Sequence, residues 1–261
     1  MLLTNCSSSD NIEDIIDPGY EKPNGNNDIL IWSDEFNEGV SPNLKNWGYD
    51  MGNGDYGWGN NEKQYYTNRP ENVIIEEGLL KITAKRENYR DHSYTSTRMK
   101  TQGRFFFTYG KVEVRAKLPT GSGTWPAIWM LGENITSVGW PSCGEIDIME
   151  HVGNRPGWTS SAIHNKAGYA GSYFGEEQYI ADVTSEFHVY GILWTEEKIE
   201  FTVDEEVYFT YNPSEKNANN WPFTANQFII LNIAMGGNLG GTINPSFTQS
   251  TMEIDYVRVY Q

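Results

Sequence analysis

Three carboxylates lie close together at residues 144–151, which read GEIDIMEH. In a regular strand Glu145 and Asp147 would point to one face and Glu150 to the other. A β-bulge near Ile148 and Met149 would shift this alternation by one residue and bring all three acids to the same face. Neighbouring acids repel one another, and bulges are frequent beside active sites. We therefore expect a catalytic strand, the alternative being a solvated acidic strand.

Two carboxyl groups on one wall of a cleft can cleave a glycosidic bond. One attacks the sugar or activates water, and the other protonates the leaving oxygen. Across a bulge, Glu145 and Glu150 are about four strand steps apart, or about 13 Å along the backbone. Side chains that lean inward can reduce this to the ~5–5.5 Å typical of retaining enzymes. The spacing therefore permits a retaining mechanism.

The elements that must position these acids are predicted to be β-strands. From Ile29 onward, short runs rich in β-branched and aromatic residues alternate with turn signals, and no helical stretch or internal repeat stands out. This pattern indicates an all-β antiparallel sandwich. The expected strands include residues 72–76, 79–85, 111–118, 145–152, 187–194, 199–203, 228–234 and 252–260.

The amino-acid composition limits the kinds of molecule that this protein can be expected to bind. The 261 residues fit one all-β domain with a sizeable core. Nine Trp and sixteen Tyr exceed what a core alone needs, and aromatic faces stack on sugar rings, although sandwich packing accounts for some of them. A formal charge of −16 argues against nucleic acid, and mildly against a sulfated polysaccharide. We expect an uncharged glycan as the partner.

Residues 1–28 are predicted to form a truncated lipoprotein-type leader followed by a flexible tether. Residues 3–10 (LTNCSSSD) look like the end of a bacterial lipoprotein signal with a lipidatable Cys6. Asn5 departs from the small residue usual at its position, and the charged and apolar regions that should come before are missing. No run reaches the ~18 apolar residues of a transmembrane helix. We expect a secreted or outer-surface bacterial lipoprotein whose only membrane contact is a lipid on Cys6.

The two cysteines, Cys6 and Cys143, are too few for a disulfide framework. Cys143 adjoins the acidic strand, but a nucleophilic cysteine would need a histidine partner, and the carboxylates already explain the chemistry. We expect Cys143 to be a small buried residue.

Residues 140–150 (WPSCGEIDIME) closely resemble the active-site strand of glycoside hydrolase family 16, in its laminarinase-like branch. They meet the family pattern E-x-D-x-x-E, including the extra bulge residue. The resemblance implies a β-jelly-roll sandwich of two antiparallel sheets with a concave cleft, formed by residues 29–261 as the catalytic domain. Similar motifs in the correct order are WSDEF at 32–36, NNEKQYYT at 60–67, TWPAIWML at 124–131, AMGGN at 234–238 and DYVRVY at 255–260.

The resemblance assigns roles to the three acids. It implies that Glu145 is the nucleophile, that Glu150 is the general acid/base, and that Asp147 orients and tunes the pair. Burial and neighbouring negative charge both raise the pKa of a carboxyl group, so we expect the pKa of Glu150 to rise to roughly 6–7, whereas Glu145, the first to ionise, should stay near the ordinary ~4.3. The implied activity is endo-hydrolysis of β-1,3-glucosidic linkages in laminarin-type β-glucans with retention, without a cofactor for catalysis.

Three tryptophans are expected in the cleft. Trp125 and Trp129 are four residues apart, so they share one face of a strand with Ala127. The alternative for both is packing between the sheets. Trp140 matches a family position that stacks near the scissile bond.

Four polar residues complete the expected substrate site. Asn61 and Glu62 match the family's substrate-binding loop. Arg98 precedes a strand and is expected to contact a sugar hydroxyl, with a surface salt bridge as the alternative. His164 matches a position beside the cleaved sugar. The four histidines of the chain lack metal-ligand spacing, which argues against metal binding by His164.

A structural Ca²⁺ on the convex side is also implied by the resemblance. The matching positions are Asp255, through its carboxylate, and backbone oxygens around Glu35 and Gly78. Hard oxygen ligands suit Ca²⁺. The alternative is that Asp255 only pairs with a neighbouring residue.

Other functions remain open. A mixed-linkage β-1,3-1,4-glucanase (licheninase) or a marine galactan hydrolase would use the same strand with different cleft loops. A non-catalytic glucan-binding module is a third alternative, but such relatives typically lose acids that this chain keeps. We expect a monomer that binds β-glucan polysaccharide.

Overall fold

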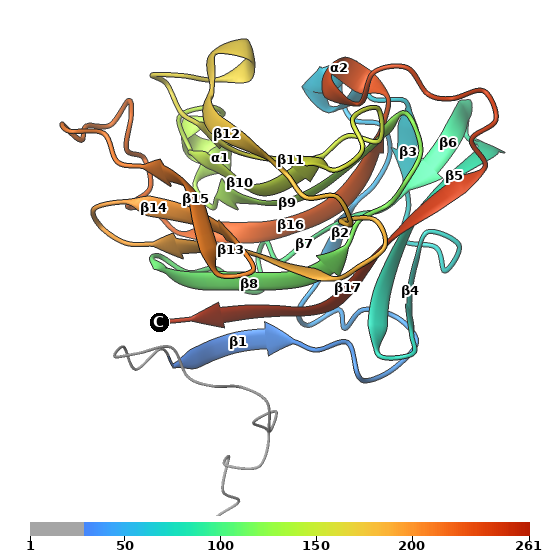
Figure 1. Cartoon of the computed structure of the whole chain (residues 1–261), viewed down its shortest axis with the longest axis horizontal. Coiled ribbons are helices and arrows are strands. Elements are labelled where there is room, and N and C mark those ends of the chain that lie inside the picture. Colours follow the sequence, from blue (N-terminus) through green and yellow to red (C-terminus); the bar gives the residue numbers. More distant parts are fainter. Residues whose placement is uncertain (1–28) are drawn as a thin grey trace, which may run out of the picture.

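The computed structural model describes residues 29–261, which form two stacked β-sheets (Figure 1). The expected leader and tether, including Cys6, lie outside the described residues. The helical segments are short: η2 (Gly57–Asn61), α1 (Ile135–Val138), η3 (Ala170–Ser172) and α2 (Gly237–Gly240). The strands are β1 (Leu30–Asp34), β2 (Gly48–Asp50), β3 (Gln64–Tyr66), β4 (Val73–Glu76), β5 (Leu79–Tyr89), β6 (His92–Ser96), β7 (Arg98–Lys100), β8 (Gly110–Lys117), β9 (Thr124–Gly132), β10 (Glu145–His151), β11 (Trp158–His164), β12 (Phe174–Tyr179), β13 (His188–Trp194), β14 (Ile199–Val203), β15 (Glu206–Tyr211), β16 (Gln227–Met235) and β17 (Gln249–Tyr260).

The larger sheet has ten strands and the smaller has seven. The larger follows the order β15-β14-β13-β8-β17-β5-β6-β3, with β1 paired to β17 and β4 paired to β5. The smaller follows the order β12-β11-β10-β9-β16-β7-β2. The predicted antiparallel sandwich is confirmed, except that β3 and β6 pair in parallel.

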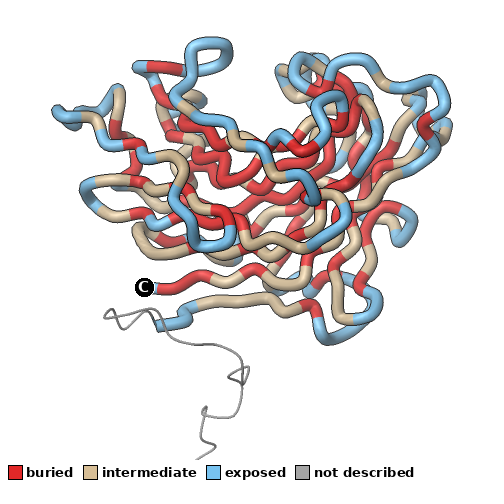
Figure 2. The backbone as a smooth tube through the Cα atoms, viewed as in Figure 1, coloured by how far each residue is buried: buried red, intermediate tan, exposed pale blue. Residues whose placement is uncertain are grey.

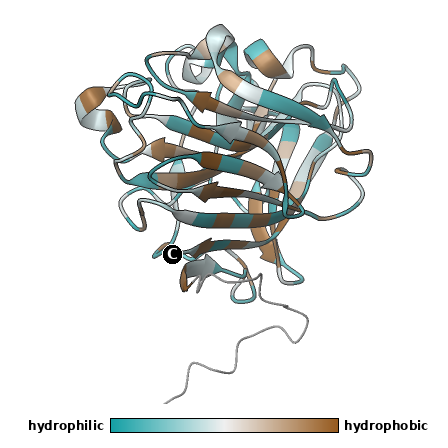
Figure 3. Ribbon diagram, turned by 60° about the vertical axis from the view of Figure 1, so that its left-hand side comes forward, coloured by the Kyte–Doolittle hydropathy of each residue, from teal (hydrophilic) through white to brown (hydrophobic). Residues whose placement is uncertain are grey.

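Alternating sequence patterns explain the layers. All eight strands expected from the sequence form, with ends within a few residues of the expected ones. β5 alternates between buried and partly exposed side chains along its first half, as expected for a strand with one face on a core. Figure 3 shows this banding of hydrophilic and hydrophobic residues on several strands. All nine residues of β16 are buried, which suits its central position in the smaller sheet.

The main core lies between the two sheets, where Figure 2 shows most of the buried backbone. From the smaller sheet it receives Ile128 and Met130 of β9 and Ile146 and Ile148 of β10. A second, smaller cluster lies on the other face of that sheet and consists of Leu131, Cys143, Phe228 and Ile230. The prediction that Cys143 is a small buried residue is therefore confirmed.

Among residues 29–261, no helix is long and apolar enough to cross a membrane.

Above the smaller sheet, β12 and the loop before it lie at one end and α2 lies at the other (Figure 1). The face between them carries the acids of β10.

Candidate active site

The predicted bulge in β10 is confirmed by the pairing register. Asp147 pairs with Ala162 of β11 and Glu150 pairs with Ser160, so two residues of β10 oppose the single residue Ser161. The register with β9 shifts at the same place. The extra residue brings Glu145, Asp147 and Glu150 to the face that is turned away from the main core.

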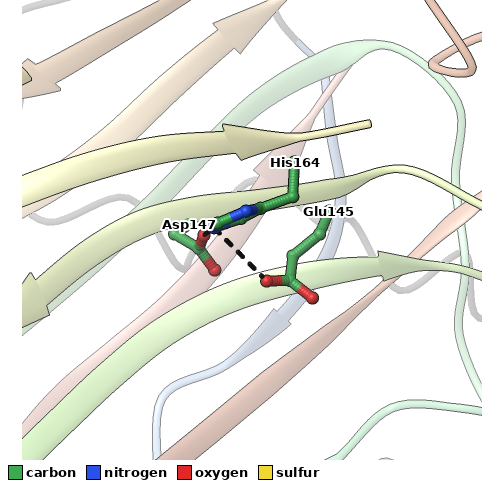
Figure 4. Close-up of side chains that lie close together, drawn as sticks. All are labelled: Glu145, Asp147 and His164. Carbon is green, nitrogen blue, oxygen red and sulfur yellow. Dashed lines mark ion pairs between the residues drawn. The ribbon is translucent and has the colours of Figure 1, made fainter. Parts of the chain in front are cut away.

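His164 lies across the ladder from Glu145 and faces two of the acids (Figure 4). Its Nε2 atom is 3.1 Å from Asp147 Oδ2 and 3.7 Å from Glu145 Oε1. The three side chains thus meet within 4.8 Å. The structure places His164 beside Glu145 and Asp147, and its position beside the cleaved sugar stays a prediction.

Each of the two glutamates accepts a hydrogen bond from a tryptophan. Trp140 Nε1 donates to Glu145 Oε2 at 3.0 Å, and Trp125 Nε1 donates to Glu150 Oε1 at 2.9 Å. An indole N–H can only donate, so it favours the ionised carboxylate that accepts from it. The two carboxyl groups are therefore held in place by different elements, the loop before β10 and the strand β9.

Burial raises the pKa of all three acids. The pKa of Glu145 and of Glu150 rises to about 8, mainly through burial and then through the charge of Asp147. Burial also raises the pKa of Asp147 to about 8. The prediction that Glu150 is raised is confirmed in direction. The prediction that Glu145 stays near its ordinary value is wrong, because Glu145 is as deeply buried among the same charges.

The strand β9 presents Trp125, Ala127 and Trp129 on the face that carries the acids. Trp129 Nε1 donates to Asn232 Oδ1 at 2.7 Å, and its ring packs on the smaller apolar cluster. Neither tryptophan belongs to the main core between the sheets. The alternative of packing between the sheets is therefore wrong for both residues.

Arg98 lies between two aromatic rings. Its guanidinium carbon is 4.5 Å from the ring centre of Trp58 and 4.7 Å from that of Trp129. Its Nε atom is 3.0 Å from Asp50 Oδ2. The salt bridge considered for Arg98 is present, and the residue is also close enough to the acids for its charge to lower the pKa of Glu145.

Asn61 and Glu62 have different environments. The exposed Asn61 donates to Asn238 Oδ1 at 2.9 Å and so links η2 to α2. Glu62 is buried, which raises its pKa, and it accepts hydrogen bonds from Gln64 at 2.6 Å and Tyr66 at 3.2 Å. Asn61 thus lies at the surface of the loop, whereas the Glu62 carboxylate is already hydrogen-bonded to neighbouring side chains.

Several residues of the site were missed by the sequence analysis. Asn232 donates to Tyr66 at 3.1 Å and accepts from Trp129, which continues the network from Glu62. Tyr173 lies 5.6 Å from His164 between ring centres. Beyond Trp140, whose ring contacts Tyr169, the surface opens into a hollow of about 720 Å³. This hollow is lined by Trp140, Pro141, Ser142, Lys166, Ala167, Tyr169, Asn217, Asn219 and Asn220.

The expected Ca²⁺ positions lie together on the larger sheet, away from the acids. Pairing of Asp34 with Val257, and of Ile254 with Leu80, brackets Asp255 between the end of β1 and the start of β5. The carboxylate of Asp255 is paired with Arg115 at 2.5 Å. That of Glu35 is paired with Arg258 at 2.8 Å.

Glu35 and Gly78 would have to supply backbone oxygens to a Ca²⁺ ion at this place. A Ca²⁺ ion there would have to share the Asp255 carboxylate with Arg115. Calcium binding at these residues stays a prediction.

Gly144 shapes the entry to β10, and its replacement should destabilise the fold. Its φ is +77°, and a Cβ atom would lie 2.8 Å from the ring of Phe223. For Gly144→Ala we expect the free energy of unfolding to fall by about 2–4 kcal/mol, from backbone strain and overpacking together. Urea denaturation would measure this.

Gly139 offers the matched control, because its φ is +71° and its Cβ position is open. Gly139→Ala should lose only the backbone part, about 1–3 kcal/mol, because φ +71° with ψ 165° is a conformation that essentially only glycine adopts. Equal losses in the two variants would show that contact with Phe223 is irrelevant.

Two carboxyl groups on one face of a β-sandwich, each accepting a hydrogen bond from an indole, provide the pair of acids that a glycoside hydrolase uses. Residues 60–258 match the family model described as Glycosyl hydrolases family 16, and the chain belongs to this family.

Comparison with individual known proteins agrees with this family assignment. The chain is 43% identical over 245 residues to "Beta-glucanase" of Rhodothermus marinus, covering 89% of this chain and 85% of that protein. It is similar to the crystal structure of laminarinase from Flavobacterium sp. UMI-01, with a TM-score of 0.85 and 43% identity over 89% of this chain and all of that one. The X-ray structure of the laminarinase from Rhodothermus marinus matches with a TM-score of 0.86 and 42% identity, over 90% and 97% of the two chains.

Proposed function

We propose that this chain is an endo-acting β-1,3-glucanase that hydrolyses laminarin-type glucans with retention of configuration. The observation that carries the proposal is the bulged strand, which turns Glu145 and Glu150 to one face. There each glutamate accepts a hydrogen bond from a different tryptophan. Similarity to laminarinases over nine-tenths of the chain supports the choice of glucan.

The mechanism has two displacements. First, the Glu145 carboxylate attacks the anomeric carbon while Glu150 gives its proton to the leaving glycosidic oxygen, so that a glycosyl–Glu145 ester forms and the sugar bond breaks. Then Glu150 takes a proton from water as the water oxygen attacks the same carbon, and the ester breaks to free Glu145. Two inversions give net retention, and no cofactor takes part.

The surroundings of the two glutamates suit these roles. Glu145 must be an anion in the first step, and the neighbouring His164 lowers its pKa against the effect of burial. Glu150 must hold a proton, and burial together with the charge of Asp147 raises its pKa. His164 and Asp147 act in the same directions on the other glutamate too, so the assignment of nucleophile and acid rests on the family pattern.

The charge of the cleft favours a neutral glucan over a sulfated galactan. Arg98, whose charge lowers the pKa of Glu145, is already paired with Asp50 and stacked on two rings, and the only other cation described above near the site is Lys166, a single lysine in the hollow beyond Trp140. A sulfate pocket would need a cation that is free to bind the ligand. A mixed-linkage glucan remains the second candidate, because it carries the same sugar and no charge.

A substrate panel tests the proposal. Purified protein should release oligosaccharides of several lengths from laminarin, with less product from lichenan and none from porphyran or carrageenan. Proton NMR of the first product should show the β-anomer. Activity on a sulfated galactan with none on laminarin, or initial appearance of the α-anomer, would overturn the substrate or the mechanism respectively. Tight laminarin binding without release of reducing ends would instead indicate a binding module.

Asp147→Asn should shift the pH profile of kcat/KM downward. The charge of Asp147 raises the pKa of both Glu145 and Glu150, so its removal lowers both values. The acidic limb, where Glu145 ionises, and the basic limb, where Glu150 loses its proton, should each move to lower pH. We expect the maximal rate to fall as well, because Asp147 also contacts His164. A basic limb that stays in place or rises would contradict tuning by charge repulsion.

Two further proposals concern how the domain is held and assembled. We propose that Cys6 carries a lipid that tethers residues 29–261 to the outside of a bacterial cell, on the basis of the lipoprotein-like sequence around it. We also propose a monomer. Metabolic labelling of cells with a fatty-acid analogue, with Cys6→Ser as control, tests the first, and light scattering after size-exclusion chromatography tests the second.

A further inference from the structure

The bulge of β10 has a specific partner on the neighbouring strand. Ile148 and Met149 have no residue-for-residue partner in the ladder with β11, where only Ser161 stands opposite them. Ser161 is fully buried, and its Oγ atom donates to the carbonyl oxygen of Ile148 at 2.6 Å. A serine side chain thus satisfies the backbone at the point where the strand departs from regular pairing.

Tyr208 holds this serine from the opposite sheet. The register of β15 with β14 shifts between Phe201 and Thr202, which pair with Phe209 and Val207, so Tyr208 is the extra residue of a second bulge. Its hydroxyl group forms a hydrogen bond with Ser161 Oγ. The single proton of Ser161 is given to Ile148, so Tyr208 must be the donor. The chain of hydrogen bonds therefore runs from one sheet, through the core, to the catalytic strand.

We propose that Ser161 and Tyr208 are positioning residues that fix the bulge of β10 and thereby hold Glu150 on the same face as Glu145. This inference deepens the proposed function and, for its kinetic part, rests on it. In a regular strand Glu150 would point away from Glu145, so the bulge is what makes the pair. Loss of the serine hydroxyl would leave the Ile148 carbonyl without this donor and would free the bulge to move.

Two other buried hydroxyls provide a contrast to this arrangement. Within the described part of the chain, Ser96 Oγ and Tyr190 Oη are buried and have no hydrogen-bond partner. They offer matched controls, because Ser96→Ala and Tyr190→Phe remove the same groups as Ser161→Ala and Tyr208→Phe. Neither control residue is part of the proposed chain of hydrogen bonds.

Steady-state kinetics on the proposed substrate tests the inference. For Ser161→Ala we expect kcat on laminarin to fall about 10- to 100-fold with KM within about threefold, because a misplacement of about 1 Å can lower a rate 100-fold. For Tyr208→Phe, which keeps the ring, we expect a fall of about three- to tenfold. Both controls should keep kcat within about twofold.

Three outcomes decide the kinetic test. Unchanged kcat in Ser161→Ala, with only a lower melting temperature, would overturn the proposal. So would equal losses of kcat in the two controls. If Ser161→Ala does not fold, Tyr208→Phe decides alone, and a wild-type kcat in that variant would overturn the proposal.

Amide hydrogen exchange separates this inference from the proposed function, because it needs no substrate. Exchange in the peptide covering residues 146–151 should be at least about tenfold faster in Ser161→Ala than in the wild type, and unchanged in Ser96→Ala. Unchanged exchange in Ser161→Ala would overturn the proposed role in fixing the bulge. A wild-type protein that does not cleave any β-glucan, with the expected exchange pattern, would instead refute the proposed function alone.

Discussion

Replacement of Glu145 by Gln should abolish hydrolysis of laminarin, with kcat lower by about 10⁴-fold or more. The amide cannot attack the anomeric carbon, so the covalent intermediate does not form. Binding should persist, because the tryptophans and polar groups that surround the sugar are retained. Reducing-end assays measure the first effect, and calorimetry with laminarin oligosaccharides measures the second.

Stability supplies the control for this variant. The pKa of Glu145 is raised in the folded protein, from 4.5 to about 8. A raised pKa contributes stability that is present below the unfolded value and is lost as pH rises through the folded value. Gln cannot ionise, so Glu145→Gln should have a melting temperature at pH 8 at least as high as that of the wild type. A folded variant with near-wild-type kcat would show that a different group is the nucleophile.

The bulge illustrates what local sequence can predict. Because side chains alternate along a strand, acids at positions 145, 147 and 150 share a face only if one residue is inserted between the second and the third. The register of Asp147 and Glu150 with β11 confirms this insertion. The alternating run of β5 predicted a strand because burial on one face has a period of two, whereas the short, mostly apolar run of β16 predicted a strand buried on both faces.

Contacts between distant segments could not be predicted in the same way. Asn232 joins Tyr66 and Trp129 into one network, but these residues are far apart in the chain and nothing local marks them as partners. The buried position of Glu62 depends on Gln64 and Tyr66 turning toward it. The pKa of Glu145 was misjudged because burial was applied to Glu150 alone, whereas burial, the largest effect, raises the pKa of both glutamates and depends on the packing of the whole cleft wall.

The contacts of Arg98 also could not be predicted fully from the sequence. Both a sugar contact and a salt bridge were considered, as if they excluded each other. The structure places the residue in a salt bridge and also between two rings of the cleft, because β7 lies beside both β2 and β16. Its effect on substrate would therefore pass largely through the orientation of Trp58 and Trp129.

Replacement of Glu150 by Gln should lower kcat on laminarin by about 10²- to 10⁴-fold, the usual contribution of a general acid/base. The loss should depend on the leaving group. A glycosidic oxygen of glucose needs a proton to leave, whereas a dinitrophenolate does not, so an aryl β-glucoside with that group should form the glycosyl–enzyme at close to the wild-type rate.

Comparison of the two variants on the two substrates assigns the roles of the glutamates. Glu145→Gln should be inactive on both laminarin and the aryl glycoside, because the nucleophile is needed whatever leaves. Glu150→Gln should show a burst of dinitrophenol followed by slow turnover, because the second step still needs a base to activate water. Trp125→Phe, which removes the hydrogen bond to Glu150 and keeps an aromatic ring, should lose less activity than Glu150→Gln on laminarin. If Glu145→Gln gave the burst and Glu150→Gln did not, the two residues would have exchanged roles.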